Sequence, residues 1–285
     1  MKRAREDVGN IPIEYLSRHS DAFEKAVQYI LSVDSSLLEV IVAKEFPQYL
    51  IATERQLTLQ SHFKHLASGI ITQQISGAAA RSIKSRVEQL FGGTFPNYVE
   101  LQSKFAAGDS ASLRKCGLSA RKVSYVESLT AYFNQNEMRL KHLFNSGSDA
   151  EIVDDLVRNV KGIGPWSAKM FLVTSLHRQD VFAADDLGIA RGCSRYLTAR
   201  PEVLKKLMVS RTTVKRSKIK HKNSNWRIYD EDIVESCGQL FKPHRTLFMF
   251  ILWRLSSTNI DALLNTNPQL SVKPLIESNQ THSIH

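Results

Sequence analysis

Apolar residues recur every three or four positions through most of this chain, and this spacing constrains its fold more than any other feature. Residues three, four and seven apart share one face of an α-helix, whereas a half-buried strand alternates at every second residue. The helical spacing is clearest in residues 63–71, 83–91, 125–133, 152–160, 168–176 and 247–255. Strand-like alternation is scarce. The sequence therefore predicts an all-α protein.

The helical spacing extends over residues 21–265, which we expect to form the folded domain. A hydrophobic content of 42% is ordinary for a globular protein of this length. Residues 1–20 and 266–285 lack the spacing and are expected to be flexible ends. No apolar run approaches the roughly 20 residues that span a bilayer, so no membrane association is expected. Three widely separated cysteines predict neither a disulfide framework nor a metal site: Cys116, Cys193 and Cys237.

The chain is basic, with 38 Lys and Arg residues against 28 Asp and Glu residues and a net charge of +10. Such an excess favours a polyanionic partner such as nucleic acid, although it also serves solubility. Residues 200–222 break the helical spacing and are predicted to form a basic loop or a frayed helix. Phosphate contacts, a nuclear-import signal and a merely solvated surface are all compatible with its cations: Lys215, Arg216, Lys218, Lys220 and Lys222.

The segment VKGIGPWSAKMFL predicts a helical hairpin at about residues 157–170. One helix ends, Gly162 and Gly164 form a tight turn, and an amphipathic helix starts at once. Glycines permit positive φ and close approach of a phosphate to the backbone, and free N–H groups at the second helix attract anions. This hairpin is predicted to hold one DNA strand without reading its sequence.

About twenty residues after the hairpin, DVFAADDLGIARG places Asp185 and Asp186 where a connection enters the next helix. An aspartate at this position commonly caps the helix, which is worth about 1 kcal/mol. Capping and chemistry are compatible, because one carboxylate can cap while its neighbour projects toward a ligand. A hairpin, a short helix and then a carboxylate at a helix start form a specific constellation.

Four motifs carry a resemblance to a known family: LASGIITQQISGAAARSIKSRV, VKGIGPWSAKMFL, DVFAADDLGIARG and FMFILWRL. Over about residues 63–255 the chain resembles the yeast-type DNA-3-methyladenine glycosylases of the helix-hairpin-helix superfamily. The resemblance implies two helical subdomains with an active-site cleft between them. The β-domain that precedes this fold in the bacterial relative is not expected, because the residues before Phe63 have helical spacing.

The resemblance implies that Asp186 is the catalytic carboxylate and that Asp185 is its structural neighbour. An alkylated purine is already cationic, so its glycosidic bond breaks toward an oxocarbenium-like sugar that a nearby anion stabilises. Relatives with lyase activity carry a lysine nucleophile just after the hairpin, where this chain has Trp166. Lys169 lies one turn later and is expected to be exposed or to contact a phosphate. A monofunctional enzyme is therefore predicted.

The resemblance also places Trp166, Met170 and Trp253 around the base pocket. An indole face attracts a cationic methylated purine, which favours the pocket. An ordinary core position is the alternative for each tryptophan. The bacterial relative has a tyrosine in place of Met170, so the range of bases stays open. The segment QQIS is expected to fill the gap left by a flipped base through Gln74 or Ile75, with Ser76 probing the opposite base. Alternatively, Ile75 continues a helical apolar stripe.

These features together predict a nuclear base-excision repair enzyme that flips alkylated purines out of double-stranded DNA, hydrolyses the N-glycosidic bond and leaves an abasic site. Its expected substrates are 3-methyladenine and 7-methylguanine, with hypoxanthine and ethenoadenine as further candidates. We expect a monomer that needs no redox cofactor or divalent metal, with an alkali ion on the hairpin carbonyls of Val160 and Ile163 as an option. The alternatives are a glycosylase for oxidised or mismatched bases and a non-catalytic DNA-binding module.

Overall fold

The computed structural model describes residues 11–51, 58–220 and 225–257, and all regular elements in these ranges are helical. The α-helices are α1 (Ile13–Leu16), α2 (Asp21–Val33), α3 (Leu38–Val42), α4 (Leu59–Thr72), α5 (Gly77–Leu90), α6 (Tyr98–Ala106), α7 (Ser110–Lys115), α8 (Ala120–Gln135), α9 (Glu137–Ser146), α10 (Asp149–Asn159), α11 (Pro165–Thr174), α12 (Leu187–Thr198), α13 (Pro201–Val209), α14 (Glu231–Gln239) and α15 (Arg245–Leu255). The predicted all-α class is confirmed. None of the described helices is long and apolar enough to cross a membrane.

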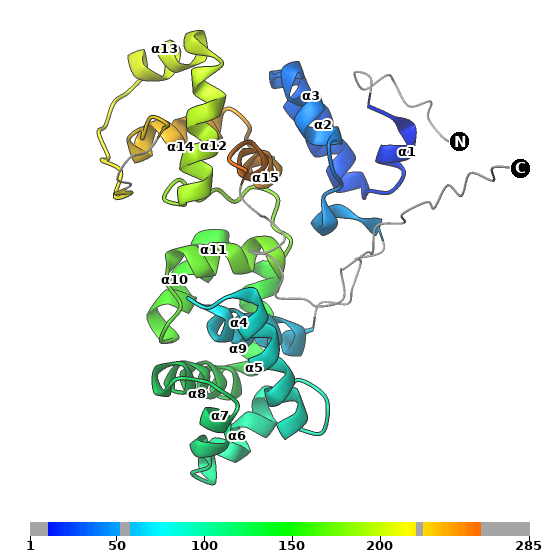
Figure 1. Ribbon diagram of the computed structural model, residues 1–285, viewed down its shortest axis with the longest axis vertical. Coiled ribbons are helices and arrows are strands. Elements are labelled where there is room, and N and C mark those ends of the chain that lie inside the picture. The colour runs from blue at the N-terminus through cyan, green and yellow to red at the C-terminus, as the bar shows by residue number, and fades with distance from the viewer. Residues whose placement is uncertain (1–10, 52–57, 221–224, 258–285) are drawn as a thin grey trace, which may run out of the picture.

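The helices form two groups, one above the other in Figure 1. Helices α4–α11 make the lower group, whose core includes Phe63 packed against Tyr98 and Phe133 at ring distances of 5.5 and 5.2 Å. Helices α1–α3 and α12–α15 make the upper group, where Phe241 stacks on Phe248 at 3.7 Å. The upper group therefore combines helices from before α4 with helices from after α11. The predicted pair of helical subdomains is confirmed.

Helix ends follow local signals in the sequence. Thr58 and Ser61 form a reciprocal capping box at the start of α4. Ser76 caps α5 by accepting a hydrogen bond from the backbone N–H of Ala79 at 3.3 Å. After α5 the chain turns through Gly92, whose φ of +79° suits a residue without Cβ. Helices α4 and α5 thus include the predicted ranges 63–71 and, except for its last residue, 83–91.

Two stretches differ from the sequence prediction. Residues 11–20 were expected to be flexible, but they contain α1, and its Tyr15 and Leu16 are buried. Four residues are too few to show helical spacing, and Tyr15 is held by tertiary hydrogen bonds to the carbonyls of Ile41 and Lys44. Within 200–222, which was expected to be a basic loop or a frayed helix, residues 201–209 form the regular helix α13, and residues 211–220 have no helical structure. The remaining expectations for residues 1–10, 221–222 and 258–285, including the predicted tail, lie outside the described residues.

A glycine allows the helix that begins at Asp186 to touch the last helix. A Cβ atom at Gly192 of α12 would lie 2.0 Å from the carbonyl oxygen of Leu252 in α15, far inside a van der Waals contact. The two backbones therefore meet directly at this point. This close approach brings Trp253, the residue after Leu252, to the start of α12, which is the geometry on which the candidate site depends.

Two buried histidines join α4 to the end of α11. His62 Nδ1 lies 2.9 Å from the Ser175 hydroxyl, and His65 Nε2 lies 2.6 Å from the Thr174 hydroxyl. Burial disfavours the imidazolium form and lowers the pKa of each histidine to about 4. Both side chains are consequently neutral in the folded protein at neutral pH.

We predict that the free energy of unfolding falls as the pH drops from about 6.5 toward 4, the interval between the unfolded and folded pKa values. In that interval the unfolded chain binds protons that the folded chain excludes, and each pKa unit is worth about 1.4 kcal/mol. Urea titrations across this pH range measure the fall. It should be smaller in His62→Gln than in the matched surface control His142→Gln. An equal fall in both variants would show that His62 does not cause it.

Candidate functional site

Asp186 lies at the junction of the two helical groups and caps α12. Its Oδ1 accepts a hydrogen bond from the backbone N–H of Ile189 at 2.8 Å, and its side chain is half-buried. Asp185, the preceding residue, is exposed. The residue predicted for chemistry is therefore also the one that caps the helix. Its carboxylate is fixed to the positive end of the α12 dipole.

Both predicted pocket tryptophans donate to this carboxylate. Trp166 of α11 donates its indole N–H to Asp186 Oδ2, and Trp253 of α15 donates to Oδ1, each at 2.9 Å. Together with the N–H of Ile189, three donors reach one carboxylate from three helices. Hydrogen bonds to an ionised acceptor are roughly twice as strong as neutral ones, so this arrangement suits an anion. It leaves Oδ2, which has one protein donor, as the better-placed oxygen for a further ligand.

The three residues expected around the base pocket differ in their exposure. Trp166 is half-buried, Met170 is 9% exposed and Trp253 is fully buried at 0%. Trp253 therefore has no free ring face in this structure, which differs from its predicted place as a pocket wall. The preceding residue, Leu252, meets α12 directly at Gly192, and the Trp253 indole lies against Phe250 with its N–H edge turned to Asp186.

The hairpin between α10 and α11 uses its two glycines differently. Gly162 has a φ of +82°, and a Cβ atom there would lie 2.1 Å from the ring of Tyr125 in α8. Gly164 has an ordinary φ of −98° and caps α11, and its Cβ position meets no protein atom within 4 Å. Gly162 is thus required by the turn and its packing. Gly164 instead leaves the approach to the start of α11 open.

The QQIS segment forms an exposed loop between α4 and α5. Gln74 has a φ of +56°, which is uncommon for a residue with a side chain, and Ile75 is 36% exposed. Ile75 lies outside both helices, so the alternative that it continues a helical stripe is wrong. Ser76 is exposed, and its hydroxyl is engaged as the cap of α5.

Two residues that the sequence did not single out hold this loop in place. Gln73 Nε2 donates to the carbonyl of Gly162 at 2.9 Å and so joins the QQIS loop to the hairpin. Lys122 Nζ donates to the carbonyl of Ile71 at 2.6 Å, at the end of α4. Cations favour helix C-termini, but the partner helix of Lys122 is distant in sequence, so no local signal revealed the contact.

The remaining predicted DNA contacts are engaged in ion pairs to different extents. Lys169 Nζ lies 3.9 Å from Asp185 Oδ1, which places this lysine beside the loop that carries Asp186. In the basic segment, Lys215 pairs with Glu231, and Arg216 pairs with Asp230 at 3.3 Å. Lys218 is exposed, and Lys222 lies outside the described residues.

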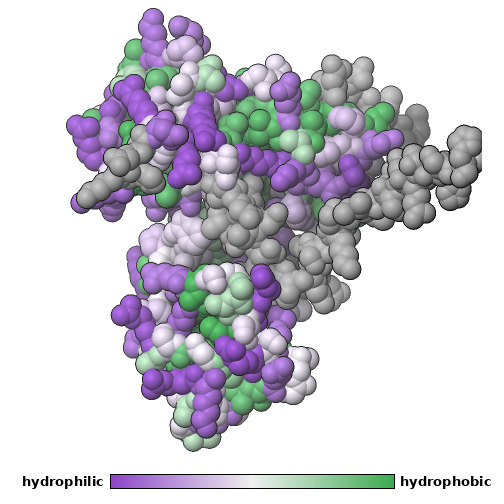
Figure 2. All heavy atoms as spheres, in the orientation of Figure 1, coloured by the Kyte–Doolittle hydropathy of each residue, from purple (hydrophilic) through white to green (hydrophobic). Residues whose placement is uncertain are grey.

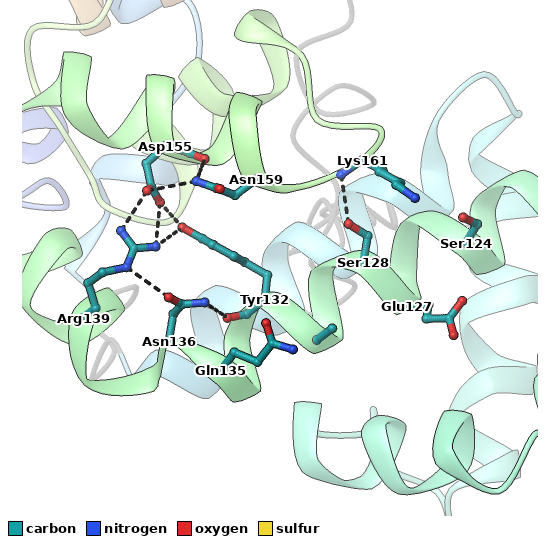
Figure 3. Close-up of a pocket in the computed structure, with 11 residues that line it drawn as sticks. Ser124, Glu127, Ser128, Tyr132, Gln135, Asn136, Arg139, Asp155, Asn159 and Lys161 are labelled. Atoms are coloured by element: carbon teal, nitrogen blue, oxygen red, sulfur yellow. Dashed lines mark hydrogen bonds and ion pairs between the residues drawn. The ribbon is translucent and has the colours of Figure 1, made fainter.

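A polar pocket of about 630 Å³ opens elsewhere, between α8, α9 and α10 (Figure 3). Asp155 accepts hydrogen bonds there from Tyr132, Arg139 and Asn159. The backbone N–H of Lys161 donates to the Ser128 hydroxyl at 3.1 Å at the rim. None of the predicted site residues lines this pocket. Its hydrogen bonds connect α8 to the base of the hairpin, which is a supporting role.

Comparison with known protein families gives one match for this chain. Residues 67–216 match the family described as "HhH-GPD superfamily base excision DNA repair protein". The chain belongs to this family. The matched range contains the QQIS loop, the hairpin and Asp186, and it ends within the basic segment.

Individual proteins show the same relationship over more of the chain. A DNA-3-methyladenine glycosylase of Saccharomyces cerevisiae is 50% identical over 93% of this chain and 92% of its own length. The crystal structure of a DNA-3-methyladenine glycosidase from Bacillus halodurans has a TM-score of 0.59 at 26% identity, covering 83% of this chain and 91% of that one. A Schizosaccharomyces pombe 3-methyladenine DNA glycosylase in complex with abasic DNA shares the fold, with a TM-score of 0.51 at 22% identity over 86% and 96% of the two chains.

We predict that Gly162→Ala and Gly164→Ala differ in their effect on the stability of the protein. Gly162→Ala combines a strained φ with a clash against Tyr125 and should destabilise the protein by about 2–4 kcal/mol. Gly164→Ala meets open space and should change stability by less than about 1 kcal/mol. Thermal unfolding measures both effects. Equal destabilisation would contradict the distinct roles assigned to the two glycines.

Proposed function

We propose that this protein is a monofunctional DNA glycosylase that hydrolyses the N-glycosidic bond of alkylated purines, 3-methyladenine among them, and leaves an abasic site. The observation that carries this proposal is the carboxylate of Asp186, held by two indole N–H groups and a helix N-terminus beside the hairpin. The relatives named above as 3-methyladenine glycosylases support it, because they align over nearly the whole chain.

The proposed chemistry needs an anion near the sugar and no proton donor. An N-alkylated purine leaves as a neutral base from a cationic substrate, so positive charge passes to the sugar as the bond breaks. The Asp186 carboxylate stabilises that developing charge electrostatically. Its Oδ2, with Trp166 as its protein donor, is the oxygen proposed to orient and deprotonate the attacking water.

Base flipping is proposed to use the loop and the hairpin together. Ile75, exposed at the loop, is the apolar group that would fill the vacated stack, with Gln74 and Ser76 on either side of it. The open approach to Gly164 would admit a DNA phosphate to the start of α11, near Lys169. The hydrogen bond from Gln73 to Gly162 would transmit the position of the anchored strand to the loop.

Several finer features are proposed on chemical grounds. Trp166 and Met170 are the residues proposed to contact the flipped base, which would include 7-methylguanine and, more weakly, hypoxanthine or ethenoadenine. The hydrolysis of an alkylated purine is proposed to need no redox cofactor or divalent metal, since the alkylated base carries its positive charge before the bond breaks. The carbonyls of Val160 and Ile163 are hard oxygen donors of the kind that hold an alkali ion, whose charge would favour a nearby phosphate. We further propose that the protein acts as a monomer in the nucleus.

We predict that Asp186→Asn lowers the single-turnover rate of base release by at least about 100-fold, the equivalent of roughly 3 kcal/mol of transition-state stabilisation. Asparagine also caps helices, so α12 should persist and binding to damaged duplex should change little. Asp185→Asn is the matched control and should retain most of the rate. Near-normal release by Asp186→Asn, or a reduced rate in the control alone, would remove Asp186 from its proposed role.

We predict that the two tryptophans affect substrates differently. Trp253→Phe removes an N–H donor to a charged acceptor, worth about 1.5–3 kcal/mol, so base release should fall about ten- to hundredfold. The fall should be equal for cationic 7-methylguanine and neutral hypoxanthine, because the buried indole has no face toward the base. Trp166→Ala should impair the cationic base more, since a cation–π contact adds about 0.5–2 kcal/mol. A larger effect on the cationic base in Trp253→Phe would return that residue to the pocket wall.

A further inference from the structure

Residues 210–220, which we name the basic strap, run without helical structure from the end of α13 toward α14. Three hydrogen bonds from the guanidinium of Arg211 clamp the strap to Asp230 and Asp232, at 2.6 to 2.8 Å. All three side chains are less than 20% exposed. Farther along, the backbone of Lys215 donates to Asp232 and accepts from the N–H of Glu231, both at 2.8 Å. The strap is therefore an ordered part of the surface.

The clamp sorts the cations of the strap into two sets. Arg211, Lys215 and Arg216 are each paired with a carboxylate at the start of α14. Lys218 and Lys220 are exposed, and the described part of the chain shows no ion pair for either. The paired cations neutralise three carboxylates that would otherwise repel a phosphate. The positive charge that the strap presents outward thus lies at Lys218 and Lys220.

The strap runs beside the loop that carries Asp186. The hydrogen bond between Lys215 and Glu231 raises the pKa of the Lys215 ammonium, and the charge of the Asp185 carboxylate adds a smaller rise. Asp185 also pairs with Lys169 at the start of α11. In Figure 1 the strap descends from α13 along the outer side of α14, to the level of the lower end of α12. Figure 2 shows hydrophilic side chains gathered over this part of the upper group.

The segment that leads from the strap into α14 is also held in place, by a contact of Trp226. The guanidinium of Arg191 in α12 lies 5.8 Å from the ring centre of Trp226, a cation–π distance. Trp226 is half-buried and precedes the carboxylates of the clamp by a few residues. The chain on both sides of Lys218 and Lys220 is consequently attached to α12 or α14, which limits how far these lysines can move from the Asp186 loop.

We propose that the basic strap is a second DNA-backbone contact, in which Lys218 and Lys220 bind phosphates of the duplex flanking the hairpin contact. Two exposed cations on an anchored segment of the surface add affinity without reading sequence and help to seat the duplex over Asp186. The carboxylates of Asp230 and Asp232 at the start of α14 hold the part of the strap that precedes these two lysines. This inference rests on the proposed function, because it takes DNA as the ligand.

The test is the salt dependence of binding to an undamaged duplex, which requires no base release. Removing one lysine–phosphate interaction should lower the slope of log K against log salt by about one, so Lys218→Gln with Lys220→Gln should lower it by about two. The matched control is Lys205→Gln with Lys206→Gln, which removes the same charge from the exposed surface of α13. The control should keep the wild-type slope.

A second variant tests the clamp between Arg211 and the carboxylates of Asp230 and Asp232. Asp232→Asn raises the net charge, which by charge alone strengthens DNA binding, yet it releases Arg211 and the backbone of Lys215. We expect weaker binding with the thermal transition retained. Equal slopes for the two double variants would overturn the proposal and leave the lysines to an import receptor or to solvent. Tighter binding by Asp232→Asn would also overturn it. If the wild type released no base but the slopes differed, only the glycosylase proposal would fail.

Discussion

The hydrogen bonding of one carboxylate determines how the rest of the structure is arranged. Asp186 accepts from Trp166 in α11, from Trp253 in α15 and from the first turn of α12. These donors come from both helical groups, so the carboxylate is also a point where the groups are joined. A half-buried anion needs such partners, because removing an ion from water without them is strongly unfavourable. The site and the junction are therefore a single arrangement.

The supporting contacts depend on two glycines. Gly192 lets α12 meet the backbone of α15, and only this approach brings Trp253 within reach of Asp186. Gly162 lets the hairpin lie against α8, and its carbonyl then receives the side chain of Gln73. In both cases the absence of a Cβ atom allows two segments to approach closely. The approach at Gly192 allows the hydrogen bond from Trp253 to Asp186, and the approach at Gly162 allows the one from Gln73. The QQIS loop, the hairpin and Asp186 are coupled through these contacts.

Most of the helical fold could be predicted from the sequence because its signals are local. Apolar spacing located α4, α5, α8, α10, α11 and α15, and the glycines of VKGIGP marked the turn between α10 and α11. The four-residue helix at Ile13–Leu16 was missed because it is about as short as the period that reveals a helix. The helix at Pro201–Val209 was not separated from the basic residues that follow it, although five of its nine residues are apolar.

By itself the sequence determined the all-α class and the hairpin, since these depend on residue type and short spacing, and its resemblance to the glycosylases implied the candidate residues of the site. Only the tertiary structure decided how those residues act on one another. The contacts of Trp253 with Asp186 and of Gln73 with Gly162 join positions 67 and 89 residues apart. The hydrogen bond from Arg211 to Asp232 likewise forms only when α13 and α14 are packed together. Periodicity shows which face of a helix is buried, but the direction of an indole N–H depends on what the neighbouring helix leaves open to it.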